Sequence, residues 1–401
     1  MLNEEYISQL LQPIVDRQEY LNMFIILKIA DRLRDVGTLR PSDLRKLQML
    51  YLSGSDVREI NLELARIANM QVRDIKNVIK ITAADSYIDV KPFYDYRHKS
   101  YIPFEKNERV QNIVSAIGRQ TEQTYRNISD SRAIGYIMDA RDSSGTSEFL
   151  SIEDTYQRSI DTAIQAVQLG IIDPEIAVQQ TIKQLLNSGL RRLYWQNGRT
   201  QRLDTAVRRN VLDGIRTLNI ELAKELGAQI GADGIELSAH ANSAPDHEPF
   251  QGHRFTLIEF DNLQNGENFI DERGNRFLAV ERAIGMWNCY HFITPVILAA
   301  SKPHYTTKQL QKFIDDNKQG MILQNGKHLT MYECKQMQRR LETRIRYAKE
   351  EQMAMRELGA DTNARLARNK VVNLTDEYKI FSKYCGLKPQ MKRASVPGYH
   401  V

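Results

Sequence analysis

Apolar residues recur at spacings of three and four over most of this chain, and this spacing predicts a fold built mainly of amphipathic helices. The clearest stripe covers residues 203–226, and Gly227 directly after it is a candidate helix C-cap. Its apolar positions are Leu203, Val207, Val211, Ile215, Leu218, Leu222 and Leu226. A chain of 401 residues can bury a sizeable core in two or three domains.

Start and stop signals divide the rest of the helical pattern. Asp173 offers a capping carboxylate before Pro174, and Thr330 with Glu333 has the spacing of a capping box. Gly359 is expected to close the long charged helix that Thr330 opens. Helices are expected over residues 4–36, from 41, over 55–84 and 107–127, from 152, from 173, and over 203–226, 330–359 and 361–386.

The periodicity changes in the middle of the chain. Residues 234–238 are predicted to form a strand, and residues 269–277 a hairpin that turns at Arg273-Gly274-Asn275. Residues 288–295 are a further extended candidate. The predicted fold class is therefore α+β and mostly helical, with the short strands in a small central module.

Four segments are expected along the chain. The polar run 142–147 is the best candidate boundary, and the Tyr-rich stretch 87–103 is expected to be a linker packed on a neighbouring element. The segments are a helical N-terminal region (1–145), a small α+β module (152–305), C-terminal helices (306–387) and an extended basic tail (388–401).

Composition narrows the class of protein. The chain carries 55 Lys and Arg against 50 Asp and Glu, and the net charge of +5 does not by itself indicate a nucleic-acid binder. Three widely spaced cysteines argue against a disulfide scaffold and for a reducing compartment. Because the chain begins with acidic residues and its apolar runs are short, we expect neither a signal peptide nor a membrane span.

A polar, histidine-rich block stands out from the helices. Five of the eight histidines lie between His240 and His304, and Cys289 lies among them. Cys289 and His291, two apart on a strand, would face the same side, with His240 and His247 as further zinc ligands. The usual close pairs of Cys or His are missing, so the pattern favours histidines that hydrogen-bond in tight turns. We therefore predict no metal and no cofactor.

Nucleophilic catalysis is another interpretation of the same block. Cys289, a histidine base and Asp246 would make a Cys–His–Asp arrangement. Nothing in the sequence places Cys289 at a helix N-terminus or a strained turn, and neither Ser238 nor Ser243 has a nucleophile-elbow motif. A Gly-rich phosphate loop is also missing, which argues against nucleotide hydrolysis. We predict no catalytic residues.

Arginines gather between positions 191 and 216, near Tyr194 and Trp195. This arginine cluster comprises Arg191, Arg192, Arg199, Arg202, Arg208, Arg209 and Arg216. It fits contact with DNA phosphates or with an acidic surface of a protein partner. The alternative is a solvated helix face, partly neutralised by Asp204 and Asp213.

The central block contains an ordered set of motif residues. They are Ser238, His240, Pro245, His247, Gln251, Gly252, Phe255, Ile284, Gly285, Asn288, Cys289, His291 and Pro295. This set resembles the tailed-phage minor capsid protein 2 family, which is related to Mu F-like head morphogenesis proteins. The family pattern runs, loosely, Ser-x-His, Arg-Pro-x-His, Trp-Gln-Gly, then Asn-Cys-Arg-His and Pro. Ala244 and Tyr290 stand here where the family commonly has arginine, and Phe250 replaces tryptophan.

The C-terminal part carries the same resemblance, so that the likeness covers roughly residues 150–401. The N-terminal helices hold no motif of this kind. The matching C-terminal features are residues 338–342 and 358–361, then Tyr378, Phe381, Ser382, Gly386, Leu387 and the basic Val-Pro-Gly tail.

The resemblance implies a structural protein of the virion, present in few copies near the portal vertex and linked to head assembly and sometimes to DNA packaging or ejection. The partners it implies are portal or major capsid proteins and, non-specifically, packaged double-stranded DNA, with no membrane contact. The location it implies is the phage head, with the host cytoplasm during assembly.

On this interpretation the motif residues build the hydrogen-bonded interior of a structural module. These residues are His240, Pro245, His247, Gln251, Gly252, Asn288, Cys289 and His291. The rival hypothesis is a metal-dependent hydrolase, such as a nuclease, that uses His240, His247, Cys289 and His291.

Overall fold

The computed structural model divides the chain into two compact units, each assembled from three separate stretches. Unit 1 comprises Met1–Gln12, Arg73–Gln123 and Arg209–Met337, and unit 2 comprises Pro13–Val72, Thr124–Arg208 and Gln338–Val401. The segment bounds expected from the sequence remain predictions. The structure describes residues 4–37, 55–88, 91–133, 136–138, 148–150, 152–168, 173–187, 192–194, 200–266, 269–270, 276–277, 282–285, 289–323 and 325–400.

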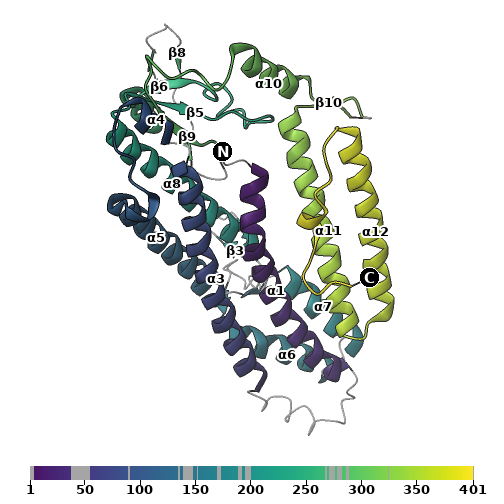
Figure 1. Ribbon diagram of the computed structural model, residues 1–401. Helices are drawn as coiled ribbons and strands as arrows, with labels where there is room; N and C mark the ends of the chain where they lie inside the picture. The colour runs from purple at the N-terminus through teal and green to yellow at the C-terminus, as the bar shows by residue number, and fades with distance from the viewer. Residues whose placement is uncertain are drawn as a thin grey trace. The chain divides into compact units, whose positions relative to one another are not determined.

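Most described residues are helical, and the strands are short, which confirms the predicted mostly helical α+β class (Figure 1). The helices are α1 (Glu4–Gly37), α3 (Ser55–Ile88), α4 (Lys91–Tyr96), α5 (Glu108–Ala133), α6 (Ile152–Gln168), α7 (Pro174–Leu186), α8 (Leu203–Ile230), α9 (Leu257–Gln264), α10 (Thr307–Gln319), α11 (Met331–Glu357) and α12 (Asp361–Tyr384). Short 3-10 helices cover Phe104–Lys106 and Met391–Ala394.

The strands pair in small antiparallel sheets. They are β1 (Tyr136–Met138), β2 (Glu148–Leu150), β3 (Arg192–Tyr194), β4 (Thr200–Arg202), β5 (Gly234–Leu237), β6 (Arg254–Thr256), β7 (Phe269–Ile270), β8 (Arg276–Phe277), β9 (Ile293–Val296), β10 (Met321–Ile322) and β11 (His328–Leu329).

Two predicted helix starts are confirmed by their capping bonds. The Asp173 carboxylate accepts from the backbone N–H of Glu175 at 2.9 Å, so it satisfies an orphan donor in the first turn of α7. Before α11, the Glu333 N–H donates to the Thr330 hydroxyl at 3.2 Å, and the Thr330 N–H donates to the Glu333 carboxylate at 2.8 Å. This is the reciprocal capping box that the spacing predicted.

One predicted helix end was wrong. Gly227 lies inside α8, which continues to Ile230 and ends at Gly231, where φ is +69°. The N–H of Ala232 donates to the Gly227 carbonyl at 2.8 Å, and the N–H of Gly231 donates to the Ala228 carbonyl at 3.4 Å. These two bonds form a Schellman motif, and the left-handed glycine that it needs is Gly231.

Two other segments differ from expectation. The Tyr-rich stretch 87–103 contains helix α4, and a 3-10 turn follows it at Phe104–Lys106. The tail after Lys388, which belongs to unit 2, forms a second 3-10 turn at Met391–Ala394 instead of standing extended. In that tail Ala394 is fully buried, and its carbonyl accepts from Lys349 on α11 at 2.7 Å. The helix expected from residue 41 and the boundary at residues 142–147 lie outside the described residues.

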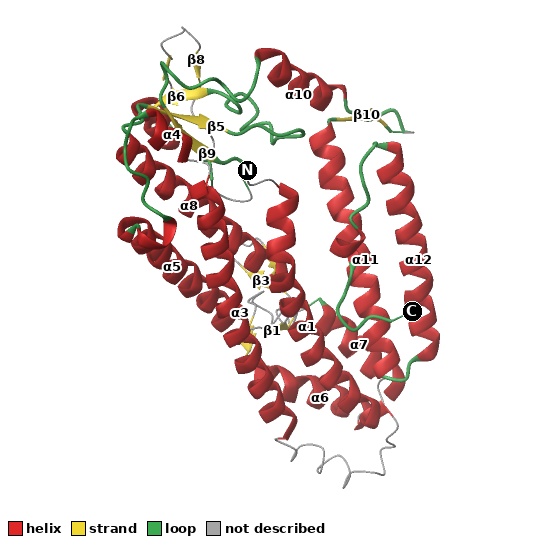
Figure 2. Cartoon of the chain, in the orientation of Figure 1, coloured by secondary structure: helices red, strands yellow, loops and turns green. Residues whose placement is uncertain are grey.

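In unit 1, β5 is the central strand of a three-stranded sheet between β6 and β9 (Figure 2). Its residue Ile235 pairs with Phe255 on β6 and with Pro295 on β9, and all four residues of β5 are buried. The strand predicted from residue 234 is therefore confirmed. The predicted hairpin is confirmed by β7 and β8, where Phe269 pairs with Phe277, and its turn lies outside the described residues.

The core of unit 2 is formed by apolar helix faces. One face of α11 is buried at Leu341, Ile345, Ala348 and Met355. The first three of these residues pack with Val371, Leu374 and Tyr378 of α12, and the two helices lie side by side (Figure 1). A larger cluster gathers Ile25, Ile29 and Leu33 of α1, Ile160 and Ile164 of α6, Ile182 and Leu185 of α7, and the end of α11.

Unit 2 also buries a cluster of five charged side chains. In this buried charge cluster, Asp204 at the start of α8 bonds to Arg346 at 2.7 Å and to Arg202 at 2.8 Å. Arg202 also lies 3.3 Å from Glu19 of α1 and 3.3 Å from Glu350 of α11, and Arg346 donates to Glu19. In this cluster three carboxylates lie around two guanidinium groups, so the carboxylates also repel one another.

The pKa values show which carboxylate of the cluster is destabilised in its charged form. Burial raises the pKa of Glu19 to about 7, with Asp204 and Glu350 adding to the effect, although Arg346 and Arg202 oppose it. Burial also acts to raise the pKa of Asp204, but Arg202 and Arg346 hold that pKa well below its usual value. Folding therefore favours the neutral form of Glu19 and the charged form of Asp204.

We predict opposite effects for Glu19→Gln and Asp204→Asn, which remove the same charge. Because the folded pKa of Glu19 exceeds its unfolded value of 4.5, its contribution to stability falls as pH rises from 4.5 to about 7. Glu19→Gln should remove this loss and raise the unfolding free energy at pH 8 by up to about 3 kcal/mol. Asp204→Asn should lower it by about 3 kcal/mol or more, because it breaks a buried ion pair. Urea unfolding across this pH range measures both, and equal destabilisation would contradict the assignment.

Candidate functional site

The histidine-rich block forms a tight loop beside the central strand of unit 1. The chain leaves β5 at Ser238 and returns to β6 through His253, whose carbonyl accepts from the N–H of Leu237 at 3.0 Å. Inside the loop, the N–H of His247 donates to the Ala244 carbonyl at 3.0 Å, and the N–H of Phe250 donates to the His247 carbonyl at 3.1 Å. These successive turns direct the His247 side chain inward, and it is 1% exposed.

The chain segment before β9 lies against this loop. The N–H of Ser238 donates to the Phe292 carbonyl at 2.8 Å, and the N–H of Phe292 donates to the Ser238 hydroxyl at 2.8 Å. This exchange of bonds fixes residues 289–292 next to the start of the histidine-rich loop. Motif residues that lie about forty positions apart in the sequence therefore meet.

Three buried side chains meet at this point, and we call them the Cys/His cluster: His247, Cys289 and His291. Their potential ligand atoms all lie within 4.8 Å of one another, and each residue is at most 3% exposed. The Cys289 sulfur lies 3.4 Å from Nδ1 of His291. His240 lies beside the cluster, with its ring centroid 4.5 Å from that of His291.

The other ring nitrogen of each cluster histidine faces an oxygen. Nε2 of His247 lies 2.7 Å from the Arg282 carbonyl, so in a neutral ring this nitrogen carries the proton. Nε2 of His291 lies 3.4 Å from the Ser243 hydroxyl. Both rings therefore leave Nδ1 for the interior of the cluster.

The remaining motif residues lie around the cluster. Gln251 is buried, and its side-chain oxygen accepts from the N–H of His240 at 3.1 Å. Pro245 is exposed in the turn before His247, and Asn288 lies outside the described residues. The structure thus brings His247, Cys289 and His291 together with His240 beside them, while their role remains a proposal.

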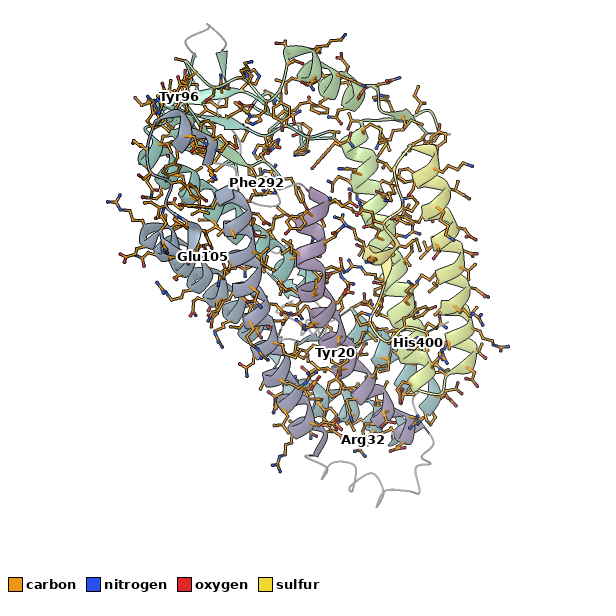
Figure 3. All side chains as sticks on the ribbon, in the orientation of Figure 1. Tyr20, Arg32, Tyr96, Glu105, Phe292 and His400 are labelled. Carbon is orange, nitrogen blue, oxygen red and sulfur yellow. The ribbon has the colours of Figure 1, made fainter. Side chains whose placement is uncertain are left out.

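Helix α8 holds the backbone of this segment through two side chains, Arg216, which the sequence placed in the arginine cluster as a candidate phosphate or partner contact, and Asn219, which the sequence did not mark as a site residue. Arg216 is 1% exposed and donates from Nε to the Cys289 carbonyl at 2.8 Å. Its guanidinium carbon lies 3.5 Å from the centre of the Phe292 ring, whose position Figure 3 labels. Asn219 accepts from the N–H of Ile293 at 2.8 Å and donates to its carbonyl at 3.2 Å. A buried polar position on an apolar helix face was the only available signal.

The cluster perturbs the pKa values of its members. Burial acts to raise the pKa of Cys289, but hydrogen bonding from His247 and the charges of His247 and Arg216 leave it below 9.0. Burial acts to lower the pKa of His247, but the interaction with Cys289 leaves that pKa raised. Burial, followed by the charges of His240 and His247, holds the pKa of His291 well below 6.5. The cluster therefore makes the Cys289 thiol easier to deprotonate and the His291 ring harder to protonate.

Of the proposed Cys–His–Asp arrangement, the structure brings only the Cys and the His into contact. Cys289 and His247 interact, but Asp246 is held by Arg282, which donates to both of its oxygens at 2.9 and 3.1 Å. Asp246 lies 3.6 Å from Nε2 of His247, which is longer than a hydrogen bond, and that nitrogen already faces the Arg282 carbonyl. Because Cys289 is 3% exposed, a substrate reaches its sulfur only after the loop moves.

The arginine cluster does not form one exposed surface. Arg202 belongs to the buried charge cluster, and Arg216 is buried beside Cys289. Arg208 and Arg209 are half-buried on α8. The side chains of Arg191, Arg192 and Arg199 lie outside the described part of the structure. Sequence clustering of charge could not distinguish buried ion pairs from a solvated face.

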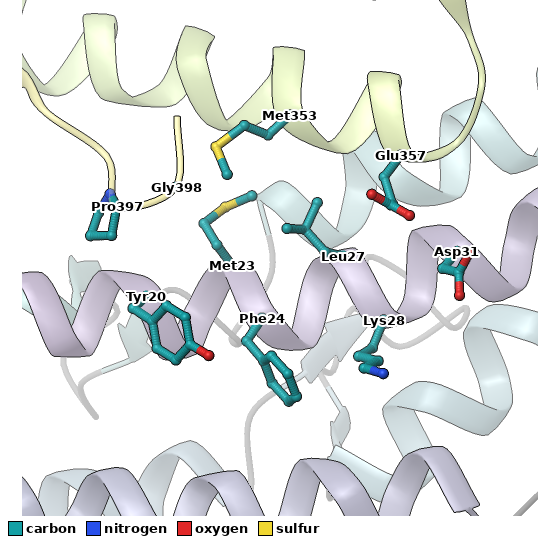
Figure 4. Close-up of a pocket in the computed structure, with 10 residues that line it drawn as sticks. All are labelled: Tyr20, Met23, Phe24, Leu27, Lys28, Asp31, Met353, Glu357, Pro397 and Gly398. Atoms are coloured by element: carbon teal, nitrogen blue, oxygen red, sulfur yellow. The ribbon is translucent and has the colours of Figure 1, made fainter. Parts of the chain in front are cut away.

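Unit 2 contains a groove of about 300 Å³ between α1, α11 and the C-terminal tail (Figure 4). Met23 and Leu27 point from α1 toward Met353 on α11. Lys28, Asp31 and Glu357 lie at one end of the groove, and Lys28 is paired with Glu59 at 2.8 Å. Its mostly apolar lining fits contact with apolar side chains better than it fits acid–base chemistry.

Comparison with known proteins decides the family. A model of the family described as phage minor capsid protein 2 matches residues 2–382. The chain belongs to this family. The match confirms the resemblance and extends it to the N-terminal helices, in which no motif was recognised. Neither a curated protein nor a solved structure matches the chain.

Family membership gives the protein a structural role in the phage virion as a minor capsid protein. The role implies interactions with other proteins of the phage head. Among the described helices, none combines the length and the apolar character that a bilayer crossing requires.

We predict that Gly252→Ala destabilises unit 1 more than Gly231→Ala does. Both glycines have positive φ, +71° and +69°, so each alanine should cost about 1–2 kcal/mol of backbone strain. A Cβ at Gly252 would also lie 2.3 Å from a methyl group of Leu310, whereas nothing lies within 4 Å of one at Gly231. Denaturant unfolding compares the two variants. Equal losses would mean that the loop accommodates Leu310 without cost.

Proposed function

We propose that this minor capsid protein is associated with the portal vertex of the phage head and contacts the packaged double-stranded DNA without sequence specificity. The family match supports the role in the head. Long helices such as α3 and α5 support docking to a helical partner such as a portal ring, because each carries exposed residues along much of its length. On this proposal, the protein is assembled in the host cytoplasm and remains in the mature head.

A portal association predicts selective binding to the portal protein of the same phage. The chain, co-expressed separately with that portal protein and with the major capsid protein, should retain the portal protein through size-exclusion chromatography. The portal protein of a phage without this family serves as the control. Retention of the major capsid protein alone would contradict the portal association and leave the head role intact.

The proposed DNA contact rests on the exposed cations of α12. Arg365, Arg368, Lys379 and Lys383 are exposed, and their spacings of three, eleven and four residues place them on one face of the helix. Lys388 and Lys392 in the tail are exposed as well. Cations arranged along one helix can each meet a phosphate of the DNA backbone, a contact that carries no sequence information.

Part of the charge on α12 is neutralised within unit 2. Lys370 pairs with Glu351 at 3.3 Å, and Glu377 pairs with Arg344 at 3.4 Å. Asp376 lies near the margin of the cationic face and offsets part of its field. We therefore assign the DNA contact to the four cations of that face and not to the arginine cluster at 191–216, of which Arg202 and Arg216 are buried.

We predict that Arg368→Gln, Lys379→Gln and Lys383→Gln together weaken binding to a mixed-sequence DNA duplex. Each lost phosphate contact should reduce the slope of log affinity against log salt by about 0.9, so the triple variant should lose up to about 3. The control replaces three exposed lysines of α10, Lys308, Lys312 and Lys318, by Gln. If both triple variants lowered the salt slope and the DNA affinity equally, the assignment of the contact to α12 would be wrong.

A further inference from the structure

We propose that the Cys/His cluster binds a zinc ion through the Cys289 sulfur and Nδ1 of both His247 and His291. The observation behind this is the convergence of three buried zinc-type ligands whose donor atoms lie within 4.8 Å of one another. This goes against the expectation of no metal, which rested on the missing close Cys and His pairs. The three ligands are far apart in the sequence, and tertiary contacts in the fold bring them close together.

The donor spacing suits a tetrahedral ion. Zinc binds sulfur at about 2.3 Å and imidazole nitrogen at about 2.0–2.1 Å, so two such ligands lie about 3.5 Å apart around a tetrahedral centre. The Cys289 sulfur and Nδ1 of His291 are 3.4 Å apart. This pair is therefore already placed at the separation that zinc would impose, and the ligand nitrogen of His247 lies within 4.8 Å of both atoms.

The outer hydrogen bonds select the correct ring nitrogens. A zinc-bound histidine commonly donates its second N–H to a carbonyl, carboxylate or hydroxyl oxygen, which fixes the ring and its tautomer. Nε2 of His247 faces the Arg282 carbonyl at 2.7 Å, and Nε2 of His291 faces the Ser243 hydroxyl at 3.4 Å. In both residues this leaves Nδ1 with its lone pair toward the cluster.

The chemistry of the three ligands suits zinc. Zinc binds a thiolate, so binding releases the Cys289 proton to solvent. The buried guanidinium of Arg216 donates to the Cys289 carbonyl at 2.8 Å and so holds the backbone that carries the sulfur. A thiolate with two imidazoles is a donor set that suits zinc and excludes the hard cations Mg²⁺ and Ca²⁺.

Such an ion would have a structural role. It would join the loop residue His247 to Cys289 and His291 before β9, two segments otherwise held by hydrogen bonds. The three ligands are nearly inaccessible, so a substrate has no direct path to the metal. The fourth coordination position is filled by a water molecule or by His240, whose ring stacks beside His291. The inference is independent of the portal and DNA contacts.

The first test is metal analysis of the full, tag-free chain, purified under reducing conditions with zinc supplied. Stoichiometric zinc is expected, and replacement by Co²⁺ should give the thiolate-to-cobalt charge-transfer absorption of a cysteine ligand. A wild-type protein that holds no zinc and gives no such absorption would overturn the proposal. This readout needs no variant, so it decides the question even if variants fail to fold.

Variants then identify the ligands. Cys289→Ser and His291→Ala should lose the zinc and the cobalt absorption, whereas Cys334→Ser, a buried thiol on α11, should keep both. Ser243→Ala keeps all three ligands and should weaken zinc affinity about 10-fold by removing the bond to His291. His240→Ala should change the cobalt spectrum if His240 is the fourth ligand. A Cys289→Ser protein with unchanged zinc content would refute the proposed site.

Discussion

The backbone of residues 289–293 is fixed by hydrogen bonds, and the candidate site depends on this constraint. Arg216 and Asn219 reach it from α8, and Ser238 reaches it from the end of β5. Each bond satisfies a backbone group that would otherwise be buried at a cost of about 1–3 kcal/mol. Because this stretch cannot shift without losing several bonds, Cys289 and His291 have a defined position against which the histidine-rich loop packs.

In unit 2 the main constraint comes from charged side chains, which pair with one another in the buried charge cluster. Arg202 of β4 and Arg346 of α11 both bond to Asp204 at the start of α8, so these ion pairs tie the three elements together. A buried ion-pair network of this kind adds specificity more reliably than stability, because desolvation offsets most of the Coulomb attraction. The raised pKa of Glu19 is the visible part of that desolvation cost.

The sequence predicted correctly those features that depend on residues close together in the chain. The caps at Asp173 and Thr330 depend on residues a few positions apart, and both were confirmed. The roles of Arg202 and Arg216 depend on partners about seventy to nearly two hundred positions away, such as Cys289 and Glu19, and the charge pattern held no sign of them. The end of α8 was predicted wrongly because two glycines lie close together, and the one that adopts the left-handed conformation after the helix is Gly231. The sequence offered the proximity of His247 and Cys289 only as a hypothesis. The structure gives their separation, because the two residues meet through tertiary contacts.

The departures from the family pattern acquire a physical meaning in this structure. Tyr290 occupies the position between Cys289 and His291 at which the family commonly has arginine, and its ring lies 5.7 Å from the Arg216 guanidinium. An arginine at that position would extend from the same backbone as Cys289, whereas here the cation beside the thiol comes from α8. The positive charge next to Cys289 is therefore supplied by another element, and Tyr290 adds a ring face that a guanidinium can contact favourably. Phe250, which stands where the family has tryptophan, is buried in the same apolar cluster as Cys289 and keeps an aromatic side chain in the loop. The Cys/His cluster is therefore bordered by the Arg216 guanidinium and by apolar side chains.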